Sequence, residues 1–144
     1  MIDFNLRLTG HGWLECRISD GRSETTATAS HLTDAIREFV AAVQRLATAS
    51  EAACEFAEEP GAYRWQFERS GDRVKITVTW NEEQSKFEGE CNYLDFARAV
   101  DRELDRALEE LGEQGYEKLW GWRFPKQAQE RLKQTIRQSM VSGT

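Results

Sequence analysis

The sequence is poor in the side chains that most often carry out chemistry. Its 144 residues include only two histidines and three cysteines. The cysteines, Cys16, Cys54 and Cys91, lie too far apart to form a metal-binding knuckle or a redox pair, and their odd number argues against a disulfide framework. The sequence also lacks a glycine-rich phosphate loop and a serine in a nucleophile elbow. We therefore predict a protein with no catalytic residue, no metal and no cofactor.

Long hydrophobic runs are absent as well. The longest apolar stretches contain only a few residues, whereas a membrane-spanning helix needs about 20. Near the N-terminus, Asp3 and Arg7 interrupt the apolar stretch that a signal peptide requires. These two absences predict a protein that does not interact with a membrane and that is located in the cytoplasm.

Strict alternation of apolar and polar residues is the clearest pattern that is present. Two alternating runs flank the turn Ser70-Gly71-Asp72, and together they predict a β-hairpin with one buried face. Further alternating segments bounded by turn residues predict five more strands. The expected strands cover residues 2–8, 13–19, 24–29, 53–58, 63–69, 73–80 and 87–93.

Apolar residues at helical spacing predict two long helices, 32–47 and 94–111, and a shorter one at 126–140. Gly112 is a natural stop for the second helix. This order of elements predicts a single α+β domain of residues 1–144. We expect a largely antiparallel sheet of about six or seven strands, with the two long helices packed on one face and a short C-terminal helix. Residues 118–144 form a basic, aromatic-rich tail.

Charge is distributed unevenly along the chain, whose net charge is −6. The stretches 51–59 and 82–90 each hold four acids, and Lys86 is their only base. Residues 118–144 hold six bases, and Glu130 is their only acid. An acidic body disfavours nucleic-acid binding, because phosphate contacts need lysine and arginine. It favours a basic protein partner, which long-range attraction steers toward it.

Histidines and paired acids are the groups that could carry out chemistry. His11 lies in a glycine-flanked turn and His31 at the entrance of a helix, positions where a histidine is usually solvated or caps the helix. Adjacent carboxylates on a strand point to opposite faces, so neither Glu58–Glu59 nor Glu82–Glu83 can converge on one atom. We therefore expect these acids on a solvated loop rim.

Five tryptophans are an unusually large number for this length. Trp65 and Trp80 lie on the alternating core faces, which predicts a structural role. Trp13 lies on the opposite face from Leu14, so it is exposed if helices cover only one side of the sheet, and an exposed aromatic side chain is a candidate binding anchor. The aromatic residues of the tail are expected mainly to pin the C-terminal segment; they are Trp120, Trp122 and Phe124.

Two short patterns resemble those of a group of bacterial proteins that have no established activity. The first is Glu59-Pro60-Gly61-x-Tyr63-Arg64-Trp65, and the second is Gly112-Glu113-x-Gly115-Tyr116-x-x-x-Trp120-x-x-x-Phe124-Pro125. The shared features are turn residues and aromatic positions. The resemblance implies a bacterial cytosolic α+β domain with a sheet–helix–sheet–helix order, and it implies no activity and no site residue.

These observations favour a non-enzymatic binding protein, specifically a bacterial immunity protein that neutralises a basic toxin domain through an acidic surface. The contact residues that we predict are Trp13, Glu58, Glu59, Glu82, Glu83, Glu88 and Glu90. Two alternatives remain open. One is a small-molecule-binding protein or enzyme that uses a pocket of sheet and tail aromatic residues with His11 or His31. The other is a homo-oligomeric structural or regulatory subunit, such as a homodimer.

Overall fold

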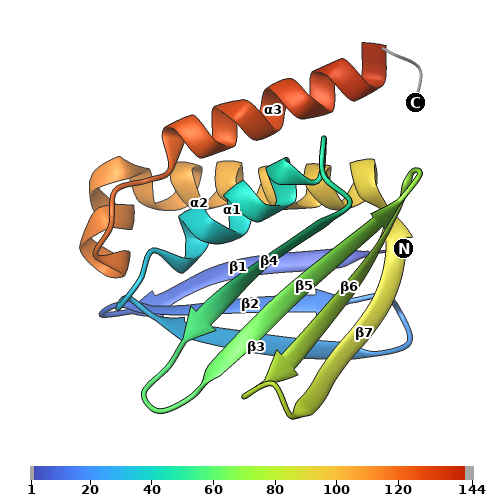
Figure 1. Ribbon diagram of the computed structural model, residues 1–144. Coiled ribbons are helices and arrows are strands. Elements are labelled where there is room, and N and C mark those ends of the chain that lie inside the picture. The colour runs from blue at the N-terminus through green and yellow to red at the C-terminus, as the bar shows by residue number, and fades with distance from the viewer. Residues whose placement is uncertain (1, 142–144) are drawn as a thin grey trace.

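The computed structural model describes residues 2–141, which form seven strands and three helices (Figure 1). The strands are β1 (Asp3–Gly10), β2 (Trp13–Ser19), β3 (Glu24–Ser30), β4 (Glu51–Ala57), β5 (Ala62–Ser70), β6 (Arg73–Trp80) and β7 (Gln84–Asn92). The helices are α1 (Ala35–Arg45), α2 (Tyr93–Trp120) and α3 (Lys126–Val141). The α+β class is confirmed. Residue 1 of the predicted domain 1–144 and residues 142–144 of the predicted tail lie outside the described residues.

The strands form two antiparallel sheets, so the prediction of one sheet is wrong. β1, β2 and β3 make a three-stranded sheet, and β4 to β7 make a four-stranded sheet. Alternation determines which side chains are buried, but it does not choose the neighbouring strand. Tight turns enforce pairing inside each sheet, as at Gly71, where φ is +62°. The connection from β3 to β4 contains α1 instead of a tight turn, so these two strands are free to join different sheets.

The two sheets touch where β3 and β4 end. The Ser30 hydroxyl donates a hydrogen bond to the Ala57 carbonyl at 3.2 Å. The Thr28 hydroxyl donates to the carboxylate of Glu58, the residue that follows β4. Side-chain hydrogen bonds therefore join the sheets at this end of the molecule, in place of a backbone ladder.

Helices cover the sheets in two layers (Figure 1). α1 packs against β4, α2 packs against β1, and α3 lies on α1 and α2 as an outer layer. Leu132 and Ile136 of α3 are buried, whereas Met140 is 56 % exposed. The buried apolar stripe of α3 therefore ends before Met140. None of the described helices is long and apolar enough to span a membrane.

Phe39 of α1 lies at the centre of the core. Its ring is 4.9–6.3 Å, between centroids, from five other aromatic rings, which come from both sheets and from α2. These rings belong to Phe4, Phe56, Trp65, Phe67 and Phe96. All six side chains are buried. The helix that separates the two sheets in sequence thus joins them in space.

α2 contains a break at Gly112, where φ is +70° and ψ is 168°. The predicted stop at this glycine is therefore a real interruption of the helical backbone. The chain then resumes a helical conformation up to Trp120. Tyr116 and Trp120 are fully buried in this second part, and their burial holds it against the rest of the protein.

The open edge of β1 is covered by two charged side chains of α2. The N–H of Leu6 donates to Glu103 Oε1 at 2.8 Å, and the carbonyl of Leu6 accepts from Arg106. Arg106 also donates to both oxygens of Glu103 at 3.0 Å. Glu103 is buried, so this pair satisfies backbone groups that water does not reach. It occupies the position that another strand would take at an unprotected edge.

Replacing Phe39 by alanine tests the central position of its ring. We expect Phe39→Ala to lower the free energy of unfolding by about 3–5 kcal/mol, because the cavity lies between rigid elements that cannot close together around it. Urea titration followed by circular dichroism measures the change. Leu32→Ala is the control, since Leu32 is 53 % exposed and its truncation removes no core packing. Equal losses in the two variants would contradict the central role of Phe39.

Replacing Glu103 by alanine tests the protection of the β1 edge. Glu103→Ala leaves the Leu6 N–H without its acceptor and the Arg106 guanidinium without its partner, so we expect a loss of about 3 kcal/mol. The control is Glu109→Ala, at an exposed position of the same helix, with an expected change within about 0.5 kcal/mol. Chemical denaturation of both variants measures the free energy of unfolding. An ordinary hydrogen bond contributes about 1 kcal/mol, so a smaller loss for Glu103→Ala would refute the role of this pair.

Candidate functional site

Two turns with acidic side chains lie side by side at one end of the four-stranded sheet. One turn joins β4 to β5 and the other joins β6 to β7 (Figure 1). The Asn81 N–H donates to the Ala62 carbonyl at 2.9 Å. The Ala62 N–H in turn donates to Asn81 Oδ1 at 3.0 Å. This reciprocal pair of hydrogen bonds fixes one turn against the other.

Gly61 lets an aromatic side chain pack under the first turn. Its φ is +97°, and a Cβ at this position would lie 2.7 Å from the ring of Trp80. The Trp80 ring also packs against Tyr63, with 4.8 Å between ring centroids. Both aromatic side chains are half-buried. Burial, with a smaller effect of Glu58, raises the pKa of the Tyr63 hydroxyl. The two turns thus rest on a packed aromatic pair.

The carboxylates of the two turns form a surface that we call the acidic rim, defined as Glu58, Glu59, Glu82 and Glu83. Glu59, Glu82 and Glu83 are exposed, and Glu58 is half-buried beside Thr28. Residues 58–61 and 81–83 contain no lysine or arginine. The structure therefore collects four acids, which the sequence separates into two pairs, on one end of the sheet.

Glu88 and Glu90 lie elsewhere, along β7 on the outer face of the four-stranded sheet. Glu88 pairs with Lys75 at 3.0 Å, and Glu90 pairs with Arg73 at 3.4 Å. All four side chains are exposed, so these ion pairs contribute little to stability. They do compensate the two negative charges locally. The predicted contact set is therefore divided: Glu88 and Glu90 are outside the acidic rim and next to bases.

Three large apolar side chains are exposed near the end of β3. Trp13 is 41 % exposed, Leu32 is 53 % exposed and Trp122 is 39 % exposed. They come from the start of β2, the loop between β3 and α1, and the loop between α2 and α3. We call these residues, together with His31, the aromatic end. Among them, Trp13 was the binding anchor predicted from the sequence, whereas Leu32 and Trp122 were not expected there.

Trp122 differs from its aromatic neighbours in the tail. Trp120 is fully buried, and its indole N–H donates to Asp34 Oδ1 at 3.1 Å. Phe124 is buried and packs on Tyr116 with 5.1 Å between centroids. These two residues hold the C-terminal segment in place. Trp122 instead remains on the surface, and its indole N–H donates to the His31 carbonyl at 2.9 Å.

His31 is held between two glycines. A Cβ on Gly12 would lie 2.4 Å from His31 Cδ2, and a Cβ on Gly121 would lie 3.1 Å from His31 Nδ1. Both glycines have positive φ values, +84° and +100°. The Gly12 N–H donates to the Leu119 carbonyl at 2.7 Å, which draws the β1–β2 turn onto the end of α2. Three segments that are distant in sequence therefore meet around one imidazole ring.

Neighbouring residues connect the aromatic end to the acidic rim. Trp13 is the cross-strand partner of Ser30, the residue before His31. The Ser30 hydroxyl donates to the Ala57 carbonyl, and Glu58 follows Ala57 in the chain. Of the predicted contact residues, Trp13 and Glu58 are therefore linked through the end of β3.

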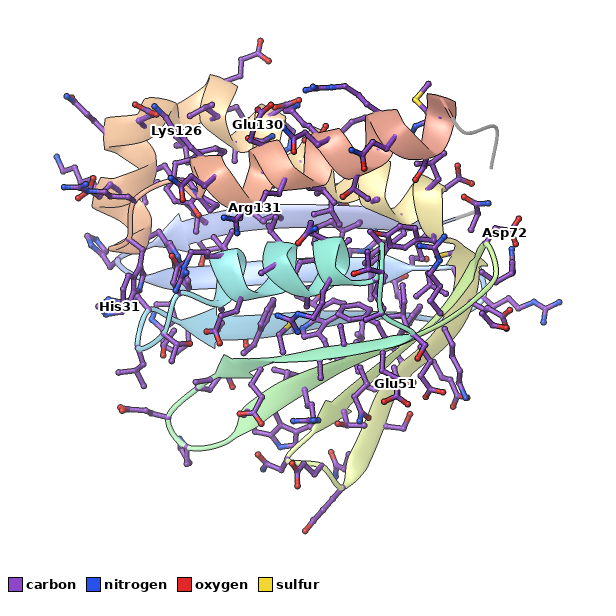
Figure 2. All side chains as sticks on the ribbon, turned by 45° about the horizontal axis from the view of Figure 1, so that its top comes forward. His31, Glu51, Asp72, Lys126, Glu130 and Arg131 are labelled. Carbon is purple, nitrogen blue, oxygen red and sulfur yellow. The ribbon has the colours of Figure 1, made fainter. Side chains whose placement is uncertain are left out.

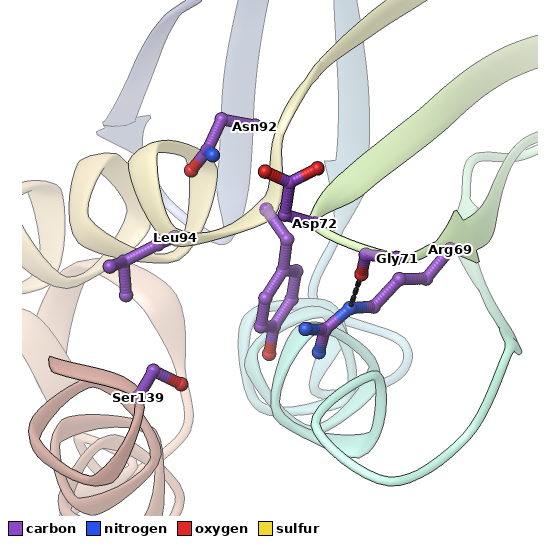
Figure 3. A pocket seen from close by; sticks show the side chains of 7 residues that line it. Arg69, Gly71, Asp72, Asn92, Leu94 and Ser139 are labelled. Carbon is purple, nitrogen blue, oxygen red and sulfur yellow. Dashed lines mark hydrogen bonds between the residues drawn. The ribbon is translucent and has the colours of Figure 1, made fainter. Parts of the chain in front are cut away.

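Five hollows in the surface of residues 2–141 are lined by neither His11 nor His31. The largest of these five hollows has a volume of about 450 Å³. It lies around Asp72, at the end of the molecule opposite His31 (Figure 2). It is open between Leu94 of α2 and Ser139 of α3 (Figure 3). The alternative of a pocket at His11 or His31 thus gains no support from these hollows.

The polar groups of the hollow at Asp72 hold the backbone in place. The Arg69 guanidinium lies 4.3 Å from the centre of the Tyr93 ring and donates to the carbonyls of Gly71 and Leu46, each at 2.8 Å (Figure 3). The Tyr93 hydroxyl donates to the Val43 carbonyl at 2.7 Å. Burial raises the pKa of this hydroxyl to about 12, although Arg69 opposes the shift. These contacts join the β5–β6 turn to the ends of α1 and α2.

The basic tail binds the acidic helix of its own chain. Lys133 of α3 donates to Asp101 and Asp105 of α2, both at 3.1 Å. The buried amide of Gln129 donates to the same two aspartates at 3.0 and 2.8 Å. Lys126 forms a further ion pair with Glu113. Much of the positive charge of residues 118–144 is therefore engaged within the protein.

The cysteines offer no reactive thiol. Cys16, Cys54 and Cys91 are free and buried. Burial raises the pKa of the Cys91 thiol to about 11, and it also raises the pKa values of the Cys16 and Cys54 thiols. A thiol with a raised pKa is a poor nucleophile and a poor metal ligand near neutral pH. No group of acids, histidines and cysteines in residues 2–141 has the arrangement of a metal site.

Comparison of the chain with protein-family models, with curated proteins and with solved structures finds no match. The geometry of the acidic rim and the aromatic end is therefore the basis for a functional assignment.

Replacing Gly12 by alanine tests the packing around His31. Gly12→Ala adds both an unfavourable positive φ and a contact with the imidazole ring. Gly21→Ala is a matched control, because its φ of +89° is nearly the same and a Cβ there meets no atom within 4 Å. We expect Gly21→Ala to cost about 1–2 kcal/mol and Gly12→Ala to cost at least about 1 kcal/mol more. Thermal and urea unfolding measure both. Equal costs would show that His31 moves aside freely.

Proposed function

We propose that this protein is a non-enzymatic binding protein, and specifically a bacterial immunity protein that neutralises a basic toxin domain in the cytoplasm. The observation that supports the proposal is the acidic rim: four carboxylates from two turns lie together where residues 58–61 and 81–83 contain no base. A toxin that grips nucleic-acid phosphates needs lysine and arginine, so it presents the complementary charge.

The acids of the rim lie where no ion pair compensates the three exposed ones among the described residues. Acids on α2 face bases of α3, and acids on β7 face bases of β6. The exposed side chains of Glu59, Glu82 and Glu83 have no such partner in the ion pairs of the described residues. A partner with positive charge is therefore attracted to this end of the molecule, which raises the rate of encounter.

The rim is also rigid, which reduces the cost of binding. The reciprocal hydrogen bonds of Asn81 and Ala62 fix the two turns, and the ring pair of Tyr63 and Trp80 supports them. A preorganised surface loses little conformational entropy when a partner binds. A rigid acidic surface of this kind suits a tight inhibitor.

Co-expression with a toxin domain tests the proposal. The probe is the C-terminal domain of the secreted protein encoded next to this chain, expressed in a bacterial host whose growth it arrests. We expect this protein to restore growth and to bind the purified domain with an affinity that falls steeply as salt is raised. A neighbouring gene that encodes no secreted toxin, or growth that stays arrested, would contradict the proposal.

Charge reversal locates the contact on the rim. We expect E59K/E83K, with one change in each turn, to slow association with the toxin domain by about tenfold or more at low salt and to flatten the salt dependence. E51K/E109K makes the same change in net charge at two exposed acids outside the rim and serves as the matched control. Stopped-flow association rates across a salt series distinguish the variants. Equal slowing by both pairs would mean that net charge acts without a specific surface.

A further inference from the structure

We propose that the aromatic end is the anchor of the interface with the basic partner: Trp13, Leu32 and Trp122 receive an apolar side chain of that partner, while the acidic rim binds the lysines and arginines around it. This inference rests on the proposed function and adds to it the residues that control the lifetime of the complex. Protein interfaces typically combine an apolar, aromatic centre with a polar border.

The Trp122 side chain is held in a fixed position. The Trp122 indole is bonded to the His31 carbonyl, and the His31 ring is packed between Gly12 and Gly121. Trp120 and Phe124 are buried and already attach the C-terminal segment to the protein, so Trp122 is not needed for that role. Trp122 remains 39 % exposed. A rigid exposed indole offers a large contact area at a small entropic cost, and tryptophan is the residue type most enriched among binding hot spots.

The three apolar residues come from segments that are distant in the sequence and meet at His31. Gly12, next to Trp13, contacts the His31 ring; Leu32 follows His31; and Trp122 bonds to His31. Isolated exposed apolar residues need no explanation, but a group from three separate segments is typical of an interaction site.

Charge indicates which partner fits this surface. The acidic rim is joined to the aromatic end through Ser30 and Ala57. Four carboxylates repel nucleic-acid phosphates and anionic lipid headgroups, and they attract a basic protein surface. The occupant is therefore a protein domain that presents an apolar side chain surrounded by lysine and arginine, which is the partner that the acidic rim already indicates.

Binding kinetics separate the anchor from the rim. The probe is the toxin domain named above, and the readout is its dissociation rate from the full-length protein by surface plasmon resonance. We expect W13A and W122A each to raise the dissociation rate about 30-fold, the effect of a hot spot, with association rates changed by less than about twofold. L32A gives a further test, because no hydrogen bond of its side chain is lost and the fold is retained. M140A, at an exposed apolar residue of α3, is the control and leaves both rates unchanged.

The possible outcomes separate the two proposals. If the wild-type protein binds the domain and all three variants dissociate at the wild-type rate, the anchor is wrong and the proposed function stands. If the wild-type protein does not bind the domain, both proposals fail. Light scattering of the free protein adds a third outcome: a dimer that W122A converts to a monomer would show that a second copy, and not a basic partner, occupies the aromatic end.

Discussion

The packing of Phe39 is the interaction on which the rest of the structure depends. α1 follows the three-stranded sheet and leads the chain into the four-stranded one. Its Phe39 ring inserts between the two sheets. Because its ring contacts residues of both sheets and of α2, the two sheets share one core although no backbone ladder joins them. The relative position of the β1–β2, β4–β5 and β6–β7 turns follows from this packing. The acidic rim and the aromatic end are adjacent only because the sheets are held in this arrangement.

Two sheets also create more strand edges than one sheet would. Side chains protect the edge of β1 and connect the ends of β3 and β4. The Glu103–Arg106 pair covers the edge of β1, and hydroxyl groups of β3 connect to the end of β4. Unprotected edges pair readily with other chains. The same hydroxyl contacts that join the sheets also bring Trp13 close to Glu58.

Local patterns in the sequence predicted most of the elements, because alternation and helical spacing are local properties. The turn at Gly71, the interruption at Gly112 and the burial of Trp65 follow from residue types alone. The division into two sheets could not be predicted, since it depends on where α1 places β4. The same holds for the site: Glu58 and Glu82 are acidic in any arrangement, but only the fold places them together. Trp122 could not be distinguished from Trp120, because both lie in one aromatic segment.

The attachment of α3 to α2 has a consequence for the whole molecule. Lys133 and Gln129 hold the basic helix on the outer layer, far from the turns of the four-stranded sheet (Figure 1). The bases of α3 are therefore neutralised by acids of α2 and kept away from the acids of the two turns. This attachment prevents α3 from acting as an internal counterion that shields Glu59, Glu82 and Glu83, so these carboxylates stay exposed to solvent.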